Sequence, residues 1–362
     1  MRFSSEGFPS NFTVPGGIID SHIQRDEQVM GRRELLAMTL ERTGLGAVLS
    51  STVGRWQGLL VLNYHRVGEA ADSMLDRGIY SATQDEFDRQ LDFLKRQFDV
   101  VGVSDLAQVM SERGRAVLIT FDDGYRDNYE YAFPVLKRHG LPATFFLTSG
   151  FIDTTALAWW DEIAWMVHSS RERWLFPFDV LPELLTLSSP ADRETAITRL
   201  LQVYKALPAD ETEKFLEDLG IRAGTGRGSP ELARDLWLSW DMIREMDRGG
   251  MDIGGHTVSH PVLSRHSLEA QRHEIVESKE RIEAMIGHPI TAFSYPVGHP
   301  ESFTEETKNL LIEAGYHWAF SFSGGFALPG KVDQLNVPRV AVAPHISHEL
   351  FQSTCRLPWL FA

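Results

Sequence analysis

Short apolar runs alternate along most of this chain with longer segments in which apolar residues recur every three or four positions. The runs at 59–67, 117–121 and 143–147 have the length and composition of strands that are buried on both faces, as in a parallel sheet. Thr83 and Glu86 have the spacing of a capping box, so a helix is expected to begin after Thr83. One face of that helix would carry four apolar residues, which are Phe87, Leu91, Leu94 and Phe98.

The same alternation returns in the C-terminal third of the chain. Further strands are expected at 99–103, 251–255, 291–295, 317–321 and 337–342. Strands that alternate with helices are typical of βαβ units, whose strands run parallel in one sheet. About seven core strands, each followed by a helix or a longer segment, predict an α/β fold of the distorted (β/α)7 TIM-like barrel type.

Two segments fall outside this alternation. The segment 151–238 is too long for an ordinary connection inside a barrel, so we expect a helical insertion there. Its expected helices are 190–206 and 212–219. Residues 1–55 are expected to form an N-terminal tail, without regular structure up to about residue 30, and one short helix at 32–49. The α/β domain would then span 56–362, interrupted by the insertion.

Composition and charge narrow the classes of partner. The 362 residues carry a formal net charge of −15, which argues against binding to nucleic acid or to an anionic membrane surface. No apolar run approaches the roughly 18 residues of a membrane span. Cys355 is the single cysteine, so no disulfide forms within the chain. The N-terminal residues lack the apolar core of a secretory signal, so a cytoplasmic location is expected.

The candidate chemistry lies at the ends of two expected strands. Asp122 and Asp123 follow the run at 117–121, and two adjacent carboxylates at the end of a core strand need a cation or a shared proton. His256 and His260 follow the strand at 251–255, and Pro261 places them on a strand end and turn rather than on a helix. Each pair alone is more often a turn or a coincidence. Together they favour a catalytic divalent transition metal.

These residues also carry a family resemblance. The strings TFDDG at 120–124 and HTVSHP at 256–261 resemble the first two motifs of the polysaccharide deacetylases, the NodB-homology or carbohydrate esterase 4 family. The resemblance extends roughly from residue 59 to the C-terminus, apart from the insertion. It implies that Asp123, His256 and His260 hold the metal, with zinc the usual choice. It also implies that Asp122 is the general base.

The third family motif departs from the usual pattern. The family has Arg-x-Pro-x-Gly, whereas this chain has SYPVG at 294–298 and therefore lacks the arginine that steadies the catalytic aspartate. Arg339, at the start of the last expected strand, is our candidate for the missing charge. The form with Tyr295 and Pro296 resembles the poly-β-1,6-N-acetylglucosamine deacetylase branch, and so does YHRV at 64–67.

The resemblance extends to further residues. The family's general acid is a late histidine, for which His345 is the candidate and His348 the alternative. A backbone N–H near Tyr125 would stabilise the oxyanion. Tyr295 and Pro296 would contact the substrate as part of the third motif. His65, at the end of the first strand, either faces the active site or is a hydrogen-bonded structural residue.

The insertion and its C-terminal flank hold six of the nine tryptophans: Trp159, Trp160, Trp165, Trp174, Trp237 and Trp240. Aromatic rings can stack on sugars, which would make the insertion a glycan-binding lid. The alternative, that most of these rings are core, is favoured for the majority. Trp159, Trp160 and Asp161 lie nearest the barrel in sequence, so we expect these three to reach substrate.

The function implied by the resemblance is a metal-dependent hydrolase that removes N-acetyl groups from an N-acetylhexosamine-containing polysaccharide or oligosaccharide. The acidic net charge favours a neutral or cationic acetylated glycan over a polyanion. Two alternatives stay open. One is an amide hydrolase of a small or lipid-linked substrate on the same fold, and the other is a glycan-binding protein without catalytic activity. The presence of Asp122 beside the metal ligands speaks against the second.

Overall fold

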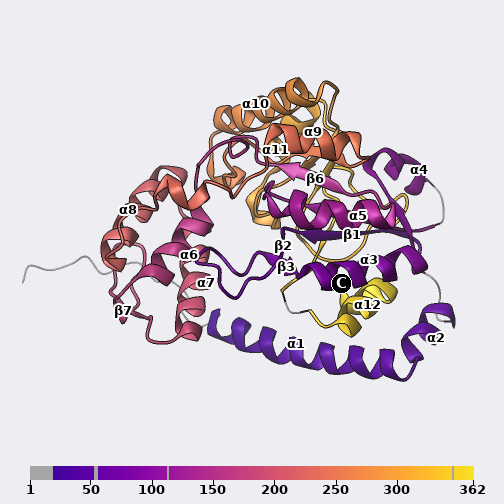
Figure 1. The fold of residues 1–362 in the computed structure, drawn as a ribbon, viewed down its shortest axis with the longest axis horizontal. Helices are drawn as coiled ribbons and strands as arrows, with labels where there is room; N and C mark the ends of the chain where they lie inside the picture. The colour runs from indigo at the N-terminus through magenta and orange to yellow at the C-terminus, as the bar shows by residue number, and fades with distance from the viewer. Residues whose placement is uncertain (1–18, 53–55, 112–113, 345) are drawn as a thin grey trace, which may run out of the picture.

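The computed structural model describes residues 19–52, 56–111, 114–344 and 346–362 (Figure 1). Within them, eight strands form one parallel sheet in the order β11-β10-β9-β6-β5-β1-β12, with β4 paired to β5. Their bounds are β1 Gly58–Tyr64, β4 Asp99–Val101, β5 Arg115–Phe121, β6 Thr144–Leu147, β9 Asp252–Gly255, β10 Ala292–Ser294, β11 Trp318–Phe320 and β12 Val340–Ala341.

The sheet closes on itself next to β12. Val337 pairs in parallel with Phe320 of β11, and Val340 pairs in parallel with Leu62 of β1. The segment 337–341 therefore joins the two ends of the strand order. This confirms the distorted (β/α)7 barrel expected from the sequence.

Alternate residues along each strand face the barrel interior and the surrounding helices. Leu59 and Val61 of β1 belong to a cluster made mostly of strand residues, which fills the barrel. Leu60 and Leu62 pack instead into the larger cluster shared with the helices. The next inward position on β1 is Asn63, which is polar and buried. Polar side chains therefore begin where the apolar filling of the barrel ends, at the carboxyl ends of the strands.

Helices cover the outside of the barrel (Figure 1). They are α3 Gln84–Gln97, α4 Leu106–Val109, α5 Phe133–His139, α9 Trp240–Arg248, α10 Leu268–Ile286 and α11 Glu305–Glu313. The capping box expected at Thr83 and Glu86 is present. Ser302 and Glu305 have the spacing of a second capping box, but that box is absent. Helix α11 is capped by Thr304 instead, whose side chain accepts from the N–H of Thr307. Ser302 lies instead in a preceding turn of 3-10 helix.

The insertion lies between β6 and α9 and forms the lobe at the left of Figure 1. It contains α6 Trp159–Ser169, a short hairpin of β7 Trp174–Leu175 and β8 Leu185–Thr186, α7 Pro190–Ala206 and α8 Thr212–Ala223. Its apolar side chains form a hydrophobic core of their own. A second short pair of strands, β2 Arg66–Val67 and β3 Tyr80–Ala82, brackets the loop that faces this lobe.

The N-terminal helices differ from the expectation. Helix α1 spans Ile19–Arg42 and α2 spans Leu45–Thr52, so helix begins before residue 30 and is longer than the one short helix at 32–49. The helical turns before residue 32 consist mostly of polar residues, and apolar residues do not recur there at helical spacing. The sequence pattern therefore gave no signal for them. Residues 1–18 of the expected tail lie outside the described residues.

Helix α1 is held by the C-terminal helices α12 His348–Arg356 and α13 Pro358–Phe361. Ala37 and Leu40 pack against Leu357 and Phe361, and Glu41 pairs with Arg356. In the part of the chain that the structure describes, no helix combines the length and the apolar character needed to cross a bilayer.

Candidate active site

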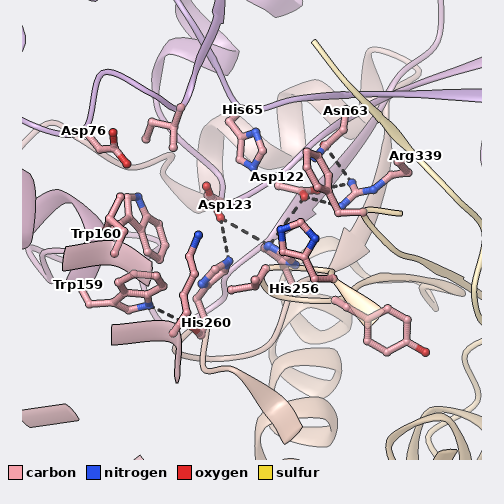
Figure 2. Close-up of a pocket in the computed structure, with 17 residues that line it drawn as sticks. Asn63, His65, Asp76, Asp122, Asp123, Trp159, Trp160, His256, His260 and Arg339 are labelled. Atoms are coloured by element: carbon pink, nitrogen blue, oxygen red, sulfur yellow. Dashed lines mark hydrogen bonds and ion pairs between the residues drawn. The ribbon is translucent and has the colours of Figure 1, made fainter. Parts of the chain in front are cut away.

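Three potential metal ligands meet at the carboxyl ends of β5 and β9. Asp123 follows β5, His256 follows β9, and His260 lies on the turn after it (Figure 2). One side-chain donor atom from each lies within 4.8 Å of the other two. The Nε2 atoms of His256 and His260 are each 3.5 Å from Oδ1 of Asp123. The site opens into a cavity of about 190 Å³.

The donor set fits a divalent cation. Nδ1 of His256 lies 2.7 Å from the carbonyl oxygen of Ser294, which can only accept, so Nδ1 carries the proton. In the neutral ring, Nε2 therefore presents a lone pair to the Asp123 carboxylate. Oδ1 of Asp123 is buried and has no hydrogen-bond partner among the described residues. Two imidazoles and a carboxylate that converge in this way match a catalytic zinc-type site.

The pKa values of these groups follow from burial and charge. Burial would raise the pKa of Asp123, but the neighbouring histidines outweigh it and hold that pKa below its usual range. Burial and the nearby charge of His256 lower the pKa of His260 to about 3, so this ring is neutral near pH 7. Burial also lowers the pKa of His256, but Asp122 and Asp123 outweigh it and raise that pKa. A cation here would replace the proton between His256 and Asp123.

The backbone at the site is strained. Asp123, Thr257, His260 and Val297 have φ values of 75°, 67°, 58° and 65°. Such left-handed conformations are uncommon outside glycine and cost of order 1–3 kcal/mol each, so the surrounding structure must enforce them. Gly255 is required for a different reason, because a Cβ there would lie 2.3 Å from Oη of Tyr316. The local chain is therefore shaped to aim these side chains at one point.

Arg339 lies against Asp122, where the sequence analysis placed the missing charge. Its Nη1 donates to Oδ1 of Asp122 at 2.8 Å and its Nη2 donates to Oδ2 at 2.7 Å. The guanidinium also donates to Asn63, Thr120 and Ser294, and all of these residues are buried. Burial raises the pKa of Asp122, but the charge of Arg339 outweighs it and holds that pKa well below its usual range. Asp122 is thus an ionised carboxylate with a fixed orientation.

Arg339 reaches Asp122 from a segment other than the one that carries the third motif. Ser294 occupies the usual arginine position, and its Oγ donates to Oδ2 of Asp122 at 3.2 Å and accepts from Arg339 at 2.8 Å. A small residue at 294 therefore leaves the space that the Arg339 side chain fills.

Other expected site residues are placed as follows. His65, Trp160 and Tyr295 line the cavity. The hydroxyl of Tyr295 donates to the carbonyl of Leu335, so its ring rather than its hydroxyl faces the cavity. The side chain of Tyr125 is buried away from the cavity and donates to Asp161, so only its backbone remains available for the expected role.

The remaining candidates lie elsewhere. Pro296 is buried and does not line the cavity. His348 begins α12 and contacts Gln352 and Phe93, outside the cavity. His345 lies outside the described residues.

The insertion contributes one wall of the cavity. Trp159 and Trp160 line it, and the ring of Trp160 packs edge-on against His260 with centroids 4.5 Å apart. Trp237 and Trp240 are buried in the core, as favoured for most of the tryptophans. The expectation for Asp161 was wrong: its side chain is fully buried and accepts from Tyr125 and from the N–H of Asp76.

Besides Asn63 of β1, three polar residues that line the cavity were not predicted from the sequence: Asp76, Lys205 and His299. Asp76 comes from the loop between β2 and β3, Lys205 from α7, and His299 from the segment after β10. None stands in a motif or beside an expected core strand. Lys205 lies on the expected helix 190–206, but helical periodicity alone gives no reason to aim it at the barrel.

Asp161 predicts a pH dependence of stability. Burial raises its pKa to about 7, and the nearby Asp76 adds to this rise. The folded chain thus holds a proton that the unfolded chain, with an ordinary carboxyl pKa of about 3.9, has released. The stabilisation is complete below pH about 4 and is lost as pH rises to about 7.

Asp161→Asn removes this titration while keeping an acceptor for the Asp76 N–H. We expect the free energy of unfolding, measured in urea at several pH values, to fall between pH 4.5 and 7.5 by about 3 kcal/mol more in the unmodified chain than in the variant. Parallel pH profiles for the two proteins would contradict the assignment.

Comparisons with known proteins point to one family. A family model described as polysaccharide deacetylase matches residues 110–319, more than half of the chain. The Bacillus subtilis protein YxkH, a polysaccharide deacetylase by its name, is 24% identical over 246 residues, covering 68% of this chain and 58% of its own. A poly-beta-1,6-N-acetyl-D-glucosamine N-deacetylase of Staphylococcus aureus is 32% identical over 106 residues, covering 26% of this chain and 37% of its own. The matches thus span less than two thirds of these relatives.

Solved structures share the fold. The Streptococcus pyogenes deacetylase PplD superposes with a TM-score of 0.53 at 18% identity, covering 82% of this chain and 98% of that one. IcaB from Ammonifex degensii superposes with a TM-score of 0.51 at 21% identity, covering 85% and 98%. At these identities the likeness establishes the barrel architecture.

Proposed function

This chain belongs to the polysaccharide deacetylase family, and from that premise we propose that it is a metal-dependent hydrolase that removes N-acetyl groups from an N-acetylhexosamine-containing glycan. One observation carries the proposal: Asp123, His256 and His260 converge beside an ionised Asp122 that Arg339 holds in place. A protein that only bound glycan would not need a fixed carboxylate next to three converging metal-ligand side chains. The name of the Staphylococcus aureus relative supports a polymer of N-acetylglucosamine as the substrate class.

The residues divide the reaction between them. A divalent ion held by Asp123, His256 and His260 would polarise the acetyl carbonyl and lower the pKa of a water molecule. Asp122 would accept a proton from the attacking water, because it is ionised and Arg339 fixes both of its oxygens. The two buried neighbours of the site, Trp160 and Tyr295, exclude bulk water from this end of the cavity.

The amine that leaves needs a proton. Of the imidazoles of described residues that line the cavity, two are outside the ligand set, His65 and His299. Figure 2 shows the His65 ring facing Asp122 and Asp123 from the side opposite His260. His299 is exposed and packs against Phe322 instead. We therefore assign the proton donor to His65.

The proposal is tested by acetate release from β-1,6- and β-1,4-linked N-acetylglucosamine oligosaccharides and from small amides such as acetanilide. We expect release from an oligosaccharide, loss of release after chelation and recovery on adding Zn²⁺. Faster release from acetanilide would favour a small-amide hydrolase. Oligosaccharide binding without release would favour a glycan-binding protein.

The same assay tests the proton donor. His65→Asn is expected to slow release about 10²-fold or more, with the loss concentrated in kcat. Full activity of that variant would remove His65 from the mechanism.

A further inference from the structure

The active-site cavity continues into a larger one. The second cavity has a volume of about 600 Å³ and adjoins the first, with which it shares Asp76, Ile79, Leu201, Lys205, Val297 and His299. Its walls are α7 of the insertion, the loop between β2 and β3, and the segments after β9 and β10. A substrate that reaches the metal ligands can therefore extend past Asp76 and Lys205 along α7.

Lys205 is a cation for which no described residue provides a close partner. Its side chain is half-buried on α7 and lines both cavities. Nζ makes no hydrogen bond or ion pair with any described residue. Burial lowers the pKa of Lys205, and the charge of Asp76 partly opposes this effect. A desolvated ammonium of this kind gains most from a hydrogen-bond acceptor supplied by a ligand.

Asp76 lines the same two cavities as Lys205, but its carboxylate accepts hydrogen bonds where the ammonium of Lys205 donates them. It is buried, and one carboxylate oxygen accepts from the N–H of Gly78 at 2.8 Å. Its own N–H donates to Asp161 at 3.0 Å, which fixes the loop against the insertion. Burial raises the pKa of Asp76, and the charge of Lys205 partly offsets this. Figure 2 shows Asp76 beside Trp160, on the side of the cavity away from Arg339.

A donor and an acceptor across one cavity match the chemistry of a sugar hydroxyl. A hydroxyl donates one hydrogen bond and accepts two, so it can accept from Lys205 and donate to Asp76 at once. Ile79 and Leu201 line both cavities as well, and their apolar side chains suit the apolar face of a sugar ring. A small amide or ester without hydroxyls would offer no such hydrogen bond to Lys205 or to the second carboxylate oxygen of Asp76.

We infer that Asp76 and Lys205 form a hydroxyl-recognition subsite that positions the glycan next to the acetyl-bearing sugar, with the adjoining cavity taking the following sugar residues. This inference rests on the proposed function, since it names how the same site selects a polyhydroxylated chain. Neither residue touches the reacting bond, so both are positioning residues. Their removal should weaken the hold on a glycan more than it affects the chemistry.

The test compares Lys205→Met and Asp76→Asn with Lys214→Met in the metal-loaded full chain. Lys214 is an exposed lysine on α8 paired with Asp179, so its variant removes one positive charge from the insertion away from the cavity. Substrates are a β-1,6-linked N-acetylglucosamine tetramer and 4-nitrophenyl acetate, which has no sugar hydroxyl. Binding of the fully deacetylated tetramer is measured by calorimetry, which needs no turnover.

We expect the two cavity variants to raise KM for the tetramer about ten- to a hundredfold with little change in kcat. Their loss in kcat/KM on the tetramer should exceed their loss on 4-nitrophenyl acetate by about tenfold or more. Lys214→Met should match the unmodified chain. Equal losses on both substrates, or an unchanged KM for the tetramer, would overturn the subsite.

Calorimetry separates this inference from the proposed function. If the unmodified chain releases no acetate but binds the tetramer more tightly than Lys205→Met does, the deacetylase proposal fails and the subsite stands. If the chain releases acetate and the cavity variants bind the tetramer as tightly as the unmodified chain, the subsite fails and the deacetylase proposal stands. Absence of any tetramer binding would overturn the subsite as well.

Discussion

Replacing Asp122 by asparagine is expected to slow acetate release from an N-acetylglucosamine oligosaccharide by about 10²–10⁴-fold. The amide keeps the size of the carboxylate and can still accept one hydrogen bond from Arg339, but it cannot take up a proton from water. Because Asp123, His256 and His260 stay in place, the variant should bind Zn²⁺ with nearly unchanged stoichiometry. The measurements are initial rates at saturating substrate and metal content after dialysis.

A matched variant distinguishes the role of general base, proposed for Asp122, from that of metal ligand, proposed for Asp123. Asp123→Asn should lose both the ion and the activity, whereas Asp122→Asn should lose activity alone. Thermal unfolding of both proteins checks that each is folded. An Asp122→Asn protein with more than about a tenth of the original rate would show that another group accepts the proton.

Replacing Arg339 by methionine is expected to lower the free energy of unfolding by about 3–5 kcal/mol. The substitution leaves Asp122 as a buried carboxylate without the guanidinium, and among the described side chains Ser294 alone still donates to it. The pKa of Asp122 should rise, because burial then acts unopposed by the guanidinium. The acidic limb of the pH–rate profile should therefore move to higher pH. Urea unfolding measures the first effect and kcat/KM across pH measures the second.

The double variant Asp122→Asn with Arg339→Met tests the cause. It removes both buried charges, so it should regain most of the stability lost by Arg339→Met alone. Arg339→Lys should be intermediate, since lysine restores the charge without the two parallel hydrogen bonds. Additive losses in the double variant would show that Arg339 stabilises the barrel through its other contacts rather than through Asp122.

The sequence was informative where one residue type has one physical consequence. The continuous apolar run before Asp122 indicated a buried parallel strand, and β5 is buried along almost its whole length. Thr83 and Glu86 predicted a helix start that the structure reproduces. Pro261, directly after His260, indicated that the two histidines lie on a strand end and a turn rather than on a helix. In the structure both imidazole rings lie beside Asp123.

The sequence was less informative where position depends on the closed barrel. Arg339 was a candidate for the charge beside Asp122 because a motif arginine was absent, and only the pairing of β12 with β1 shows how it reaches that carboxylate. Asp76 and Lys205 face each other only because the insertion folds back over a loop that precedes it by many residues. The left-handed backbone at Asp123 and His260 also has no local signal, since neither is a glycine.

The lobe between β6 and α9 brings together its own set of packed side chains, separate from those of the barrel. Because the insertion has its own hydrophobic core, substitutions on its cavity wall can accumulate without disturbing the strand ends that carry the metal ligands. If α7 and the loop between β2 and β3 contact the glycan as we infer, substitutions in them would change which glycan is held and leave Asp123, His256 and His260 untouched. The residues that would set the choice of glycan and those that would hold the ion then lie in different parts of one chain.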